Sequence, residues 1–136
     1  MQVDGACHCG KITYRAEIDP QKVRICHCSD CQTMSGSAFR TVTPCAEADF
    51  TLLTGTPKVY LKTAESGNIR QQGFCGDCGT ALYATSAPDD PAPRIIGLRI
   101  GAIRQRDQLI PNLQYWARSA VPWLAHLDEM AAQEKQ

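Results

Sequence analysis

The sequence predicts a mainly β protein whose short strands are organised around metal-binding cysteine loops. Segments in which apolar and polar residues alternate, as they do in half-buried strands, recur along the chain. Glycine and proline separate these segments at short intervals. Seven of the eight cysteines fall into three closely spaced groups, a pattern typical of metal sites. Because the length suits one core and no linker divides the chain, we expect residues 1–136 to form a single domain.

Residues 1–44 contain three predicted strands. The first covers residues 11–18, where apolar and polar side chains alternate without a break. The second covers residues 23–25 and leads into a cysteine-rich loop. The third covers residues 38–43, and we expect Pro44 to end it because proline has no N–H to donate to a sheet.

The rest of the chain contains five more predicted strands and a short C-terminal helix. The strands are residues 50–54, 59–61, 69–74, 80–85 and 94–100. The first two flank Gly55-Thr56-Pro57, which predicts a hairpin. The proline-rich stretch 88–93 is predicted to be a surface loop. Pro122 opens the helix, and Leu124, Leu127 and Ala131 follow at helical spacing.

Composition excludes several classes of partner. Lysine plus arginine and aspartate plus glutamate both number 14, so the chain lacks the basic surplus of a nucleic-acid-binding protein. No apolar run approaches the ~20 residues that span a bilayer, so no membrane partner is expected. The first residues lack the pattern of a secretory signal, and we therefore expect a cytoplasmic protein. In that compartment the cysteines indicate metal ligands rather than disulfides.

Counting thiolates predicts two zinc ions per chain. The groups are Cys7 with Cys9, Cys75 with Cys78, and Cys26 with Cys28 and Cys31. The two pairs together supply the four ligands of a closed tetrahedral zinc site, and Gly79 permits a tight turn after the second pair. The triple supplies three ligands from one loop, which leaves the fourth position of its zinc open.

A purely structural alternative is that a further residue of the chain completes the second site. The candidates are Cys45, His8 and His27. Each histidine stands between two ligand cysteines, where its side chain tends to point away from the shared metal. Cys45 follows a predicted strand and a proline, and it also suits the role of a small buried apolar residue. His126, in the predicted helix, suits packing or surface better than chemistry.

The motifs resemble those of the glutathione-dependent formaldehyde-activating enzyme family, which also includes the centromere protein V domain. The resemblance rests on four sequence patterns and extends from about residue 5 to residue 127. The patterns are Gly5-x-Cys7-x-Cys9-Gly10, Cys26-His27-Cys28-Ser29-x-Cys31 with Ser35-Gly36-Ser37, Phe74-Cys75-x-x-Cys78-Gly79-Thr80, and the C-terminal Pro111-Asn112-Leu113-Gln114-Tyr115-Trp116 with Pro122-Trp123-Leu124.

The resemblance implies a β-tent fold with two zinc ions. It assigns Cys7, Cys9, Cys75 and Cys78 to a structural ion, and Cys26, Cys28 and Cys31 to a catalytic one. It further implies an activity, the joining of glutathione to formaldehyde as S-hydroxymethylglutathione, which is a carbon–sulfur lyase reaction in reverse. One departure is residues 102–106, where the family often has an acidic turn and this chain has Ala-Ile-Arg-Gln-Arg. If that turn contacts substrate, the substrate differs here.

The chemistry of an open three-thiolate site agrees with a small thiol and an aldehyde as partners. Three thiolates weaken zinc as a Lewis acid towards water, but a fourth thiol can still enter as a nucleophilic thiolate. Ser35 and Ser37, or the N–H groups of their turn, could stabilise the alkoxide that forms, or could simply be turn residues. Carboxylates of glutathione would need cations, and the candidates are Arg40, Lys62, Arg70 and Arg99.

Two other functions compete with this interpretation. Cys45-Ala46-Glu47 with Cys75-x-x-Cys78 is similar to the zinc deaminase pattern, but Phe74 stands where that pattern has proline, and five cysteines would have no role. The stronger alternative is a non-catalytic, zinc-stabilised binding module.

Overall fold

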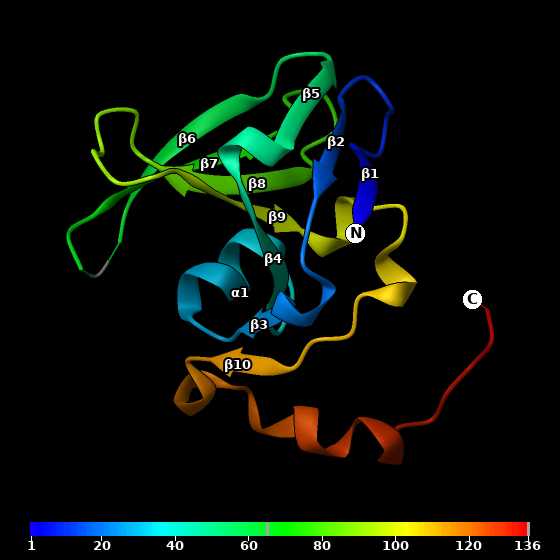
Figure 1. Cartoon of the computed structure of the whole chain (residues 1–136). Coiled ribbons are helices and arrows are strands. Elements are labelled where there is room, and N and C mark those ends of the chain that lie inside the picture. The colour runs from blue at the N-terminus through cyan, green and yellow to red at the C-terminus, as the bar shows by residue number, and fades with distance from the viewer. Residues whose placement is uncertain (65, 136) are drawn as a thin grey trace.

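The computed structural model describes residues 1–64 and 66–135 (Figure 1). Its strands are β1 (Gln2–Ala6), β2 (Thr13–Glu17), β3 (Arg24–Cys26), β4 (Arg40–Ala46), β5 (Phe50–Thr54), β6 (Lys58–Thr63), β7 (Ile69–Phe74), β8 (Ala81–Ser86), β9 (Ile95–Arg99) and β10 (Leu113–Tyr115). The helix α1 covers Ser29–Ser35, and short 3-10 helices cover Pro20–Lys22, Glu47–Asp49, Ile100–Ala102, Arg106–Gln108, Ala117–Ser119 and Pro122–Glu129. The prediction of a mainly β fold is confirmed.

The strands form two sheets. The smaller has the order β1-β2-β5 and the larger the order β10-β3-β4-β9-β8-β7-β6. All pairs are antiparallel except β10 with β3, which is parallel. In the described part of the chain, no helix is both long and apolar enough to cross a membrane.

The core lies between the small sheet and one face of the large sheet. Phe50 of β5 connects them, because its ring centroid is 5.3 Å from that of Tyr14 on β2 and 5.7 Å from that of Tyr83 on β8. Leu98 of β9 and Val3 of β1 are fully buried in the same cluster. Burial of these large side chains is the main stabilising contribution available to a domain of this size.

The opposite face of the large sheet carries the helix and a set of polar side chains. Arg40 lies opposite Cys26, and Arg99 lies opposite Val42. Residues paired in this way project from the same face of a sheet. The helix α1 lies against this face, where Lys62 of β6 forms an ion pair with Asp30 of α1.

Two predictions about turns are wrong. Pro44 does not end its strand, since β4 continues to Ala46. At Pro44, β4 pairs with β9 alone, because β3 pairs with β4 no further than Val42. One side of β4 therefore has no partner strand there, and proline is tolerated at such positions of a sheet. The segments flanking Gly55-Thr56-Pro57 do not form a hairpin either, because β5 pairs with β2 in the small sheet and β6 with β7 in the large one.

Other elements differ from the prediction in extent or type. The strands β1 and β10 and the helix α1 are absent from the prediction, and the first predicted strand is shorter than expected. The C-terminal helix is present, but it is a 3-10 helix over Pro122–Glu129 with non-helical torsion angles at His126. It buries no residue, so it lacks the packed apolar face that would stabilise a regular α-helix. Residues 88–93 form a loop, as predicted.

Candidate metal centres

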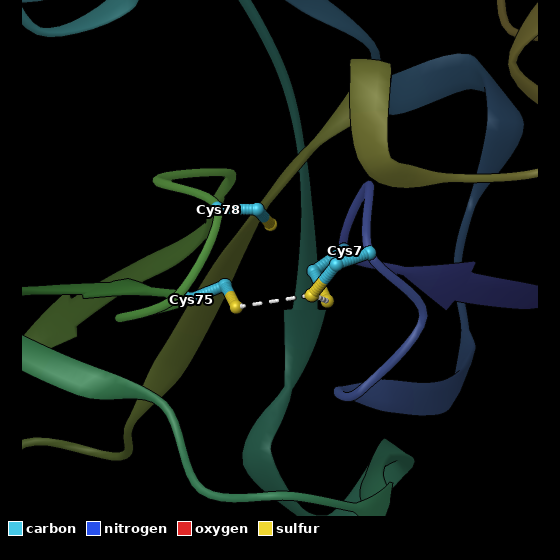
Figure 2. Close-up of side chains that lie close together, drawn as sticks. Cys7, Cys75 and Cys78 are labelled. Carbon is cyan, nitrogen blue, oxygen red and sulfur yellow. Dashed lines mark hydrogen bonds between the residues drawn. The ribbon is translucent and has the colours of Figure 1, made fainter.

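Four cysteines from distant parts of the chain meet between the two sheets. The sulfurs of Cys7, Cys9, Cys75 and Cys78 lie within 4.8 Å of one another (Figure 2). The Sγ atoms of Cys7 and Cys9 are 3.5 Å apart, and those of Cys9 and Cys75 are 3.8 Å apart. For comparison, four sulfurs bound to one zinc ion at about 2.3 Å lie about 3.8 Å from each other. The predicted grouping of the two pairs is therefore what the fold produces.

The two cysteine pairs stand on hairpin loops that are closed in the same way. In the β1–β2 loop, Cys7 N–H donates to Ile12 O, and Gly10 N–H donates to Cys7 O. In the β7–β8 loop, Cys75 N–H donates to Thr80 O, and Gly79 N–H donates to Cys75 O. Gly10 and Gly79 have positive φ angles of 78° and 75°, which residues with a Cβ rarely adopt. These glycines allow each loop to turn its two sulfurs towards the other hairpin.

A glycine and a tyrosine face each other at the base of each of these hairpins. Gly5 pairs with Tyr14 and Gly73 pairs with Tyr83, and each glycine precedes a cysteine of the cluster by two residues. A Cβ atom at Gly5 would lie 1.9 Å from Tyr14 Cζ, and one at Gly73 would lie 2.4 Å from Tyr83 Cζ. The tyrosine rings therefore occupy the space that side chains at these two glycines would need.

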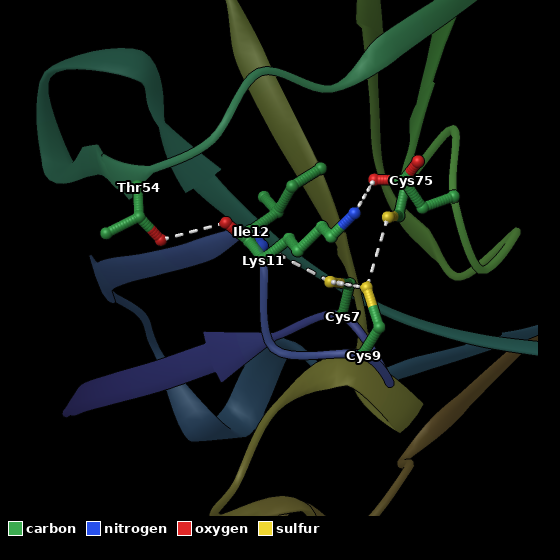
Figure 3. A network of polar contacts seen from close by, with 7 residues as sticks. Cys7, Cys9, Lys11, Ile12, Thr54 and Cys75 are labelled. Atoms are coloured by element: carbon green, nitrogen blue, oxygen red, sulfur yellow. Dashed lines mark hydrogen bonds and ion pairs between the residues drawn. The ribbon is translucent and has the colours of Figure 1, made fainter.

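Polar contacts connect the two loops (Figure 3). Ile12 N–H donates to Cys7 Sγ at 3.2 Å, and Lys11 Nζ lies 3.1 Å from the carboxylate of Asp77 in the other loop. The hydroxyl of Thr80 and backbone N–H groups nearby lower the pKa of Cys78 to about 5. Although the N–H of Lys11 favours the thiolate of Cys9, the adjacent thiols raise its pKa to about 12.

These opposed shifts bear on whether the cluster suits a metal. The pKa values of Cys78 and Cys7 are lowered, whereas Cys9 resists ionisation beside them, because like charges this close repel each other. A divalent cation among the sulfurs would remove that repulsion. The four-cysteine cluster therefore fits a thiolate-binding metal ion both in distance and in charge.

The second cluster consists of Cys26, Cys28 and Cys31, whose sulfurs also lie within 4.8 Å of one another. The Sγ atoms of Cys26 and Cys28 are 3.5 Å apart. Cys26 ends β3, and Cys28 is the N-cap of α1, where its sulfur accepts a hydrogen bond from Cys31 N–H at 3.4 Å. The helix ends at Gly36, which adopts the left-handed conformation. One turn of helix thus brings the third sulfur back to the first two.

The electrostatics of the three-cysteine cluster resemble those of the first. Burial raises the pKa of Cys31 to about 12, and the neighbouring thiols add to this shift. Burial also acts against ionisation of Cys28, but the N–H of Cys31 and the neighbouring thiols outweigh it and lower the pKa. All three cysteines are only partly buried. The cluster fits a metal ion that keeps one position accessible to solvent or to a ligand.

The residues considered as a fourth ligand lie elsewhere. Among residues 1–64 and 66–135, no histidine and no other cysteine joins the three sulfurs. His27 is buried, its Nε2 lies 2.7 Å from Gln114 Oε1, and its ring packs edge-on against Phe39. His8 is exposed. Cys45 is buried on β4 opposite Ile96, where it belongs to the core.

A cavity of about 360 Å³ lies between the end of α1 and the β7–β8 loop. Its lining residues are Met34, Ser35, Phe39, Arg40, Thr41, Gly79, Thr80, Ala81, Arg99 and Gly101. The hydroxyl of Ser35 lies within hydrogen-bond distance of the carbonyls of Gln32 and Phe39, which favours its role as a helix-end residue. Ser37 is exposed and does not line this cavity. Of the four predicted cations, only Arg40 and Arg99 line it.

The turn that departs from the family pattern lies near the first cluster. Arg104 N–H donates to Asp4 O, and Ile103 bridges to Gly5 of β1. Arg104 and Arg106 line a separate cavity of about 360 Å³ together with Cys7 and His8. The turn is therefore next to the four-cysteine cluster rather than the three-cysteine one.

Sequence reasoning missed several residues that position the second cluster. Gln32 Nε2 donates to His27 O at 2.7 Å and to Ser119 O at 3.0 Å, which connects α1 to the C-terminal segment. Gln72 accepts from Arg99 at 2.7 Å. The helix itself had a usable signal, because Asp30 lies in its first turn and Gly36 follows its end. The glutamines carried no signal, since Ser119, which Gln32 contacts, and Arg99, which Gln72 contacts, lie far away in sequence.

Comparison with known proteins gives one family and one fold. The family model described as "Glutathione-dependent formaldehyde-activating enzyme" matches residues 2–119. A crystal structure of a Rhodobacter sphaeroides protein is similar, with a TM-score of 0.60 and 19% sequence identity, over 82% of this chain and 98% of that one. At that identity the likeness shows the fold alone. Comparison with curated proteins gave no match.

Proposed function

Since the chain belongs to the glutathione-dependent formaldehyde-activating enzyme family, we propose that it is a zinc-dependent enzyme that joins a thiol to formaldehyde or another small aldehyde. The reaction is that of an S-(hydroxymethyl)glutathione synthase, with glutathione or a similar thiol as substrate. The observation that carries the proposal is the three-cysteine cluster, whose partly exposed sulfurs have no fourth partner among the described residues.

The two clusters have different roles in this proposal. Cys7, Cys9, Cys75 and Cys78 hold a structural zinc ion, since together they fill a tetrahedral shell. Cys26, Cys28 and Cys31 hold the catalytic zinc ion and leave room for one more ligand. When bound, zinc at the second site lowers the pKa of an entering thiol so that its sulfur is nucleophilic at neutral pH.

The rest of the reaction needs positioning and a proton. The thiol sulfur forms a bond to the aldehyde carbon, the carbon–oxygen double bond becomes single, and the oxygen takes up the proton that the thiol has lost. No electron acceptor is needed, because the step is an addition. The protein contributes by holding the thiol beside the aldehyde, which lowers the entropic barrier. Water can exchange the proton, since the cysteines are partly exposed.

A thiol titration of cobalt-substituted protein tests this proposal. Cobalt bound by three protein sulfurs should gain a fourth sulfur when glutathione is added, and the sulfur-to-cobalt absorption band should strengthen. With zinc restored, the protein should speed the loss of free formaldehyde in the presence of glutathione, and carbon-13 NMR should show the hydroxymethyl thioether. Cys28→Ser should lose both signals, and Cys45→Ser serves as a matched control.

A negative result in this titration is equally informative. If no thiol changes the cobalt spectrum, and that spectrum already has four protein ligands at both sites, the enzyme proposal is wrong. The zinc-stabilised binding module would then be the better description.

A further inference from the structure

A buried arginine and a partly buried one lie close together without a carboxylate partner. Arg40 is only 6% exposed, and its Nη2 has no hydrogen-bond partner among the described residues. Arg99 donates through Nη2 to Gln72 Oε1 at 2.7 Å, but its buried Nε has no partner there either. Burying an unpaired charge costs several kcal/mol, so such groups normally have a counter-ion.

Other arginines of this chain do have carboxylate partners. Arg94 lies 2.8 Å from Glu47, and Arg15 lies 3.3 Å from Asp4. In residues 1–64 and 66–135, no carboxylate lies within 4.0 Å of either Arg40 or Arg99. Several exposed or half-buried arginines also lack a carboxylate, but Arg40 is the one buried arginine of the described residues, and it has no counter-ion.

The two guanidinium groups lie close to each other and to the three-cysteine cluster. Burial and then the charges of Arg40 and, less strongly, Arg70 lower the pKa of Arg99 to about 10, while Cys31 and Cys26 act in the opposite direction. Arg40 is also the cross-strand neighbour of Cys26, and such neighbours have Cβ atoms about 5 Å apart. An anion held by the pair would therefore be beside the cluster.

Both arginines face the same space. They line the 360 Å³ cavity described above, and Arg40 also lines a neighbouring cavity of about 220 Å³. Met34, Arg40, Gly79 and Ala81 are common to the two linings, so the cavities adjoin at Arg40. Ligand sites in proteins typically enclose about 300–1,000 Å³, and the larger of these two cavities lies within that range.

We propose that Arg40 and Arg99 form the receptor for a carboxylate of the thiol substrate. The receptor rests on the proposed function, because it is the substrate's thiol that the three-cysteine cluster would take. A planar guanidinium can donate two parallel hydrogen bonds to a carboxylate, and a second guanidinium completes the charge balance. The substrate class is thus a small thiol with a carboxylate at a fixed distance from its sulfur.

The two other candidate cations do not compete for this role. Lys62 is already engaged in an ion pair with Asp30 of α1. Arg70 lies on the same face of the sheet but lines neither cavity. Arg70 is therefore the matched control, being a cation on the same face that acts on Arg99 through its charge but lines neither cavity.

The test uses S-methylglutathione, whose methylated sulfur cannot supply a thiolate. Calorimetric titration of the zinc-loaded protein measures its binding, and an analogue with both carboxylates converted to amides tests the charge. The acid should bind and the amide should bind about ten- to a hundredfold more weakly, the effect of losing a charge-assisted hydrogen bond. Arg40→Met should weaken binding of the acid by a similar factor, whereas Arg70→Met, which removes a cation outside the cavity, should have a much smaller effect.

Stability provides a second measurement. In the free protein, Arg40→Met should raise the melting temperature, because it removes an unpaired buried charge and keeps similar volume. S-methylglutathione should raise the melting temperature of the parent but not of the variant. If Arg40 were only a structural residue, its replacement would lower stability and leave ligand affinity unaltered.

Three results would overturn the receptor. They are equal binding of acid and amide, equal binding by parent and Arg40→Met, and tight binding of inorganic phosphate that S-methylglutathione cannot displace. Other results would distinguish failure of the receptor from failure of the proposed reaction. If S-methylglutathione binds through the arginines but glutathione consumes no formaldehyde, the receptor holds and the enzyme does not. If 2-mercaptoethanol, which has no carboxylate, reacts as well as glutathione, the proposed reaction is supported and the receptor is refuted.

Discussion

The contact between Gly5 and Tyr14 predicts that a single added methyl group destabilises the protein. In Gly5→Ala the new Cβ would lie 1.9 Å from Tyr14 Cζ, whereas carbon atoms in contact are about 3.6 Å apart. The ring would have to withdraw by about 1.7 Å, but it is 1% exposed and packs against Phe50. Overpacking of this kind costs about 3 kcal/mol, and the smaller backbone entropy of alanine in the unfolded chain offsets up to about 1 kcal/mol.

The net loss of about 2 kcal/mol corresponds to a fall in melting temperature of about 6–8 °C for a chain of this length. Thermal unfolding of metal-loaded protein, followed by circular dichroism, measures it. Gly101→Ala is the control, because a Cβ there has no atom within 4 Å. In Tyr14→Leu protein, which lacks the ring, Gly5→Ala should cost much less. The reasoning is refuted if Gly5→Ala melts at or above the temperature of Gly101→Ala, or if Tyr14→Leu leaves its cost unchanged.

Two further predictions concern individual cysteines. Cys78→Ser should lower the free energy of unfolding by about 3–5 kcal/mol, because it weakens a cross-link between segments 66 residues apart. Cys28→Ser should release one metal ion but lower the free energy of unfolding by only about 1 kcal/mol, since serine is itself a good N-cap for α1. Chemical denaturation with metal analysis checks both, and equal losses in the two variants would contradict the assignment of the first cluster as structural. Cys45→Ala should leave the metal content unchanged and cost about 1 kcal/mol. Burial raises the pKa of Cys45 from 9.0 to about 11, so this thiol stays protonated in the folded state while it ionises in the unfolded one. Its contribution to stability is therefore full below pH 9 and falls by up to about 2.7 kcal/mol as the pH rises to 11, so Cys45→Ala should become the more stable protein within that range. A difference that stays constant with pH would show that Cys45 is not protected from ionisation.

The sequence was most informative where structure depends on neighbours along the chain. The alternation in residues 11–18 and the spacing of the seven cysteines predicted a strand and clusters that the structure contains. It was least informative where a partner distant in sequence decides which strands pair. The strand β5 pairs with β2 rather than with β6, and Pro44 is tolerated because β3 stops short of it.

The same distinction applies to the residues near the site. Four cations were candidates from the sequence alone, and nothing local separates them. Arg40 and Arg99 differ from Lys62 and Arg70 only through the sheet register and the ion pair of Lys62. Such differences are properties of the folded chain, because they depend on which strands become neighbours.

The unequal spans of the two clusters also affect the order in which they can assemble during synthesis. The ligands Cys26, Cys28 and Cys31 leave the ribosome within six residues of each other, whereas Cys7 and Cys9 must wait for Cys78. At roughly 5–20 residues per second, that wait lasts about two to ten seconds longer than completion of the triple. During this interval the two early thiols are the nearest free ligands for a metal ion on the triple. We expect chains stalled near residue 70 to bind metal through a mixed set of sulfurs, and cobalt spectra with and without a Cys7→Ser change would show whether they do. An accessible coordination position that admits a substrate would thus have to be kept from the chain's own cysteines until the β7–β8 hairpin is made.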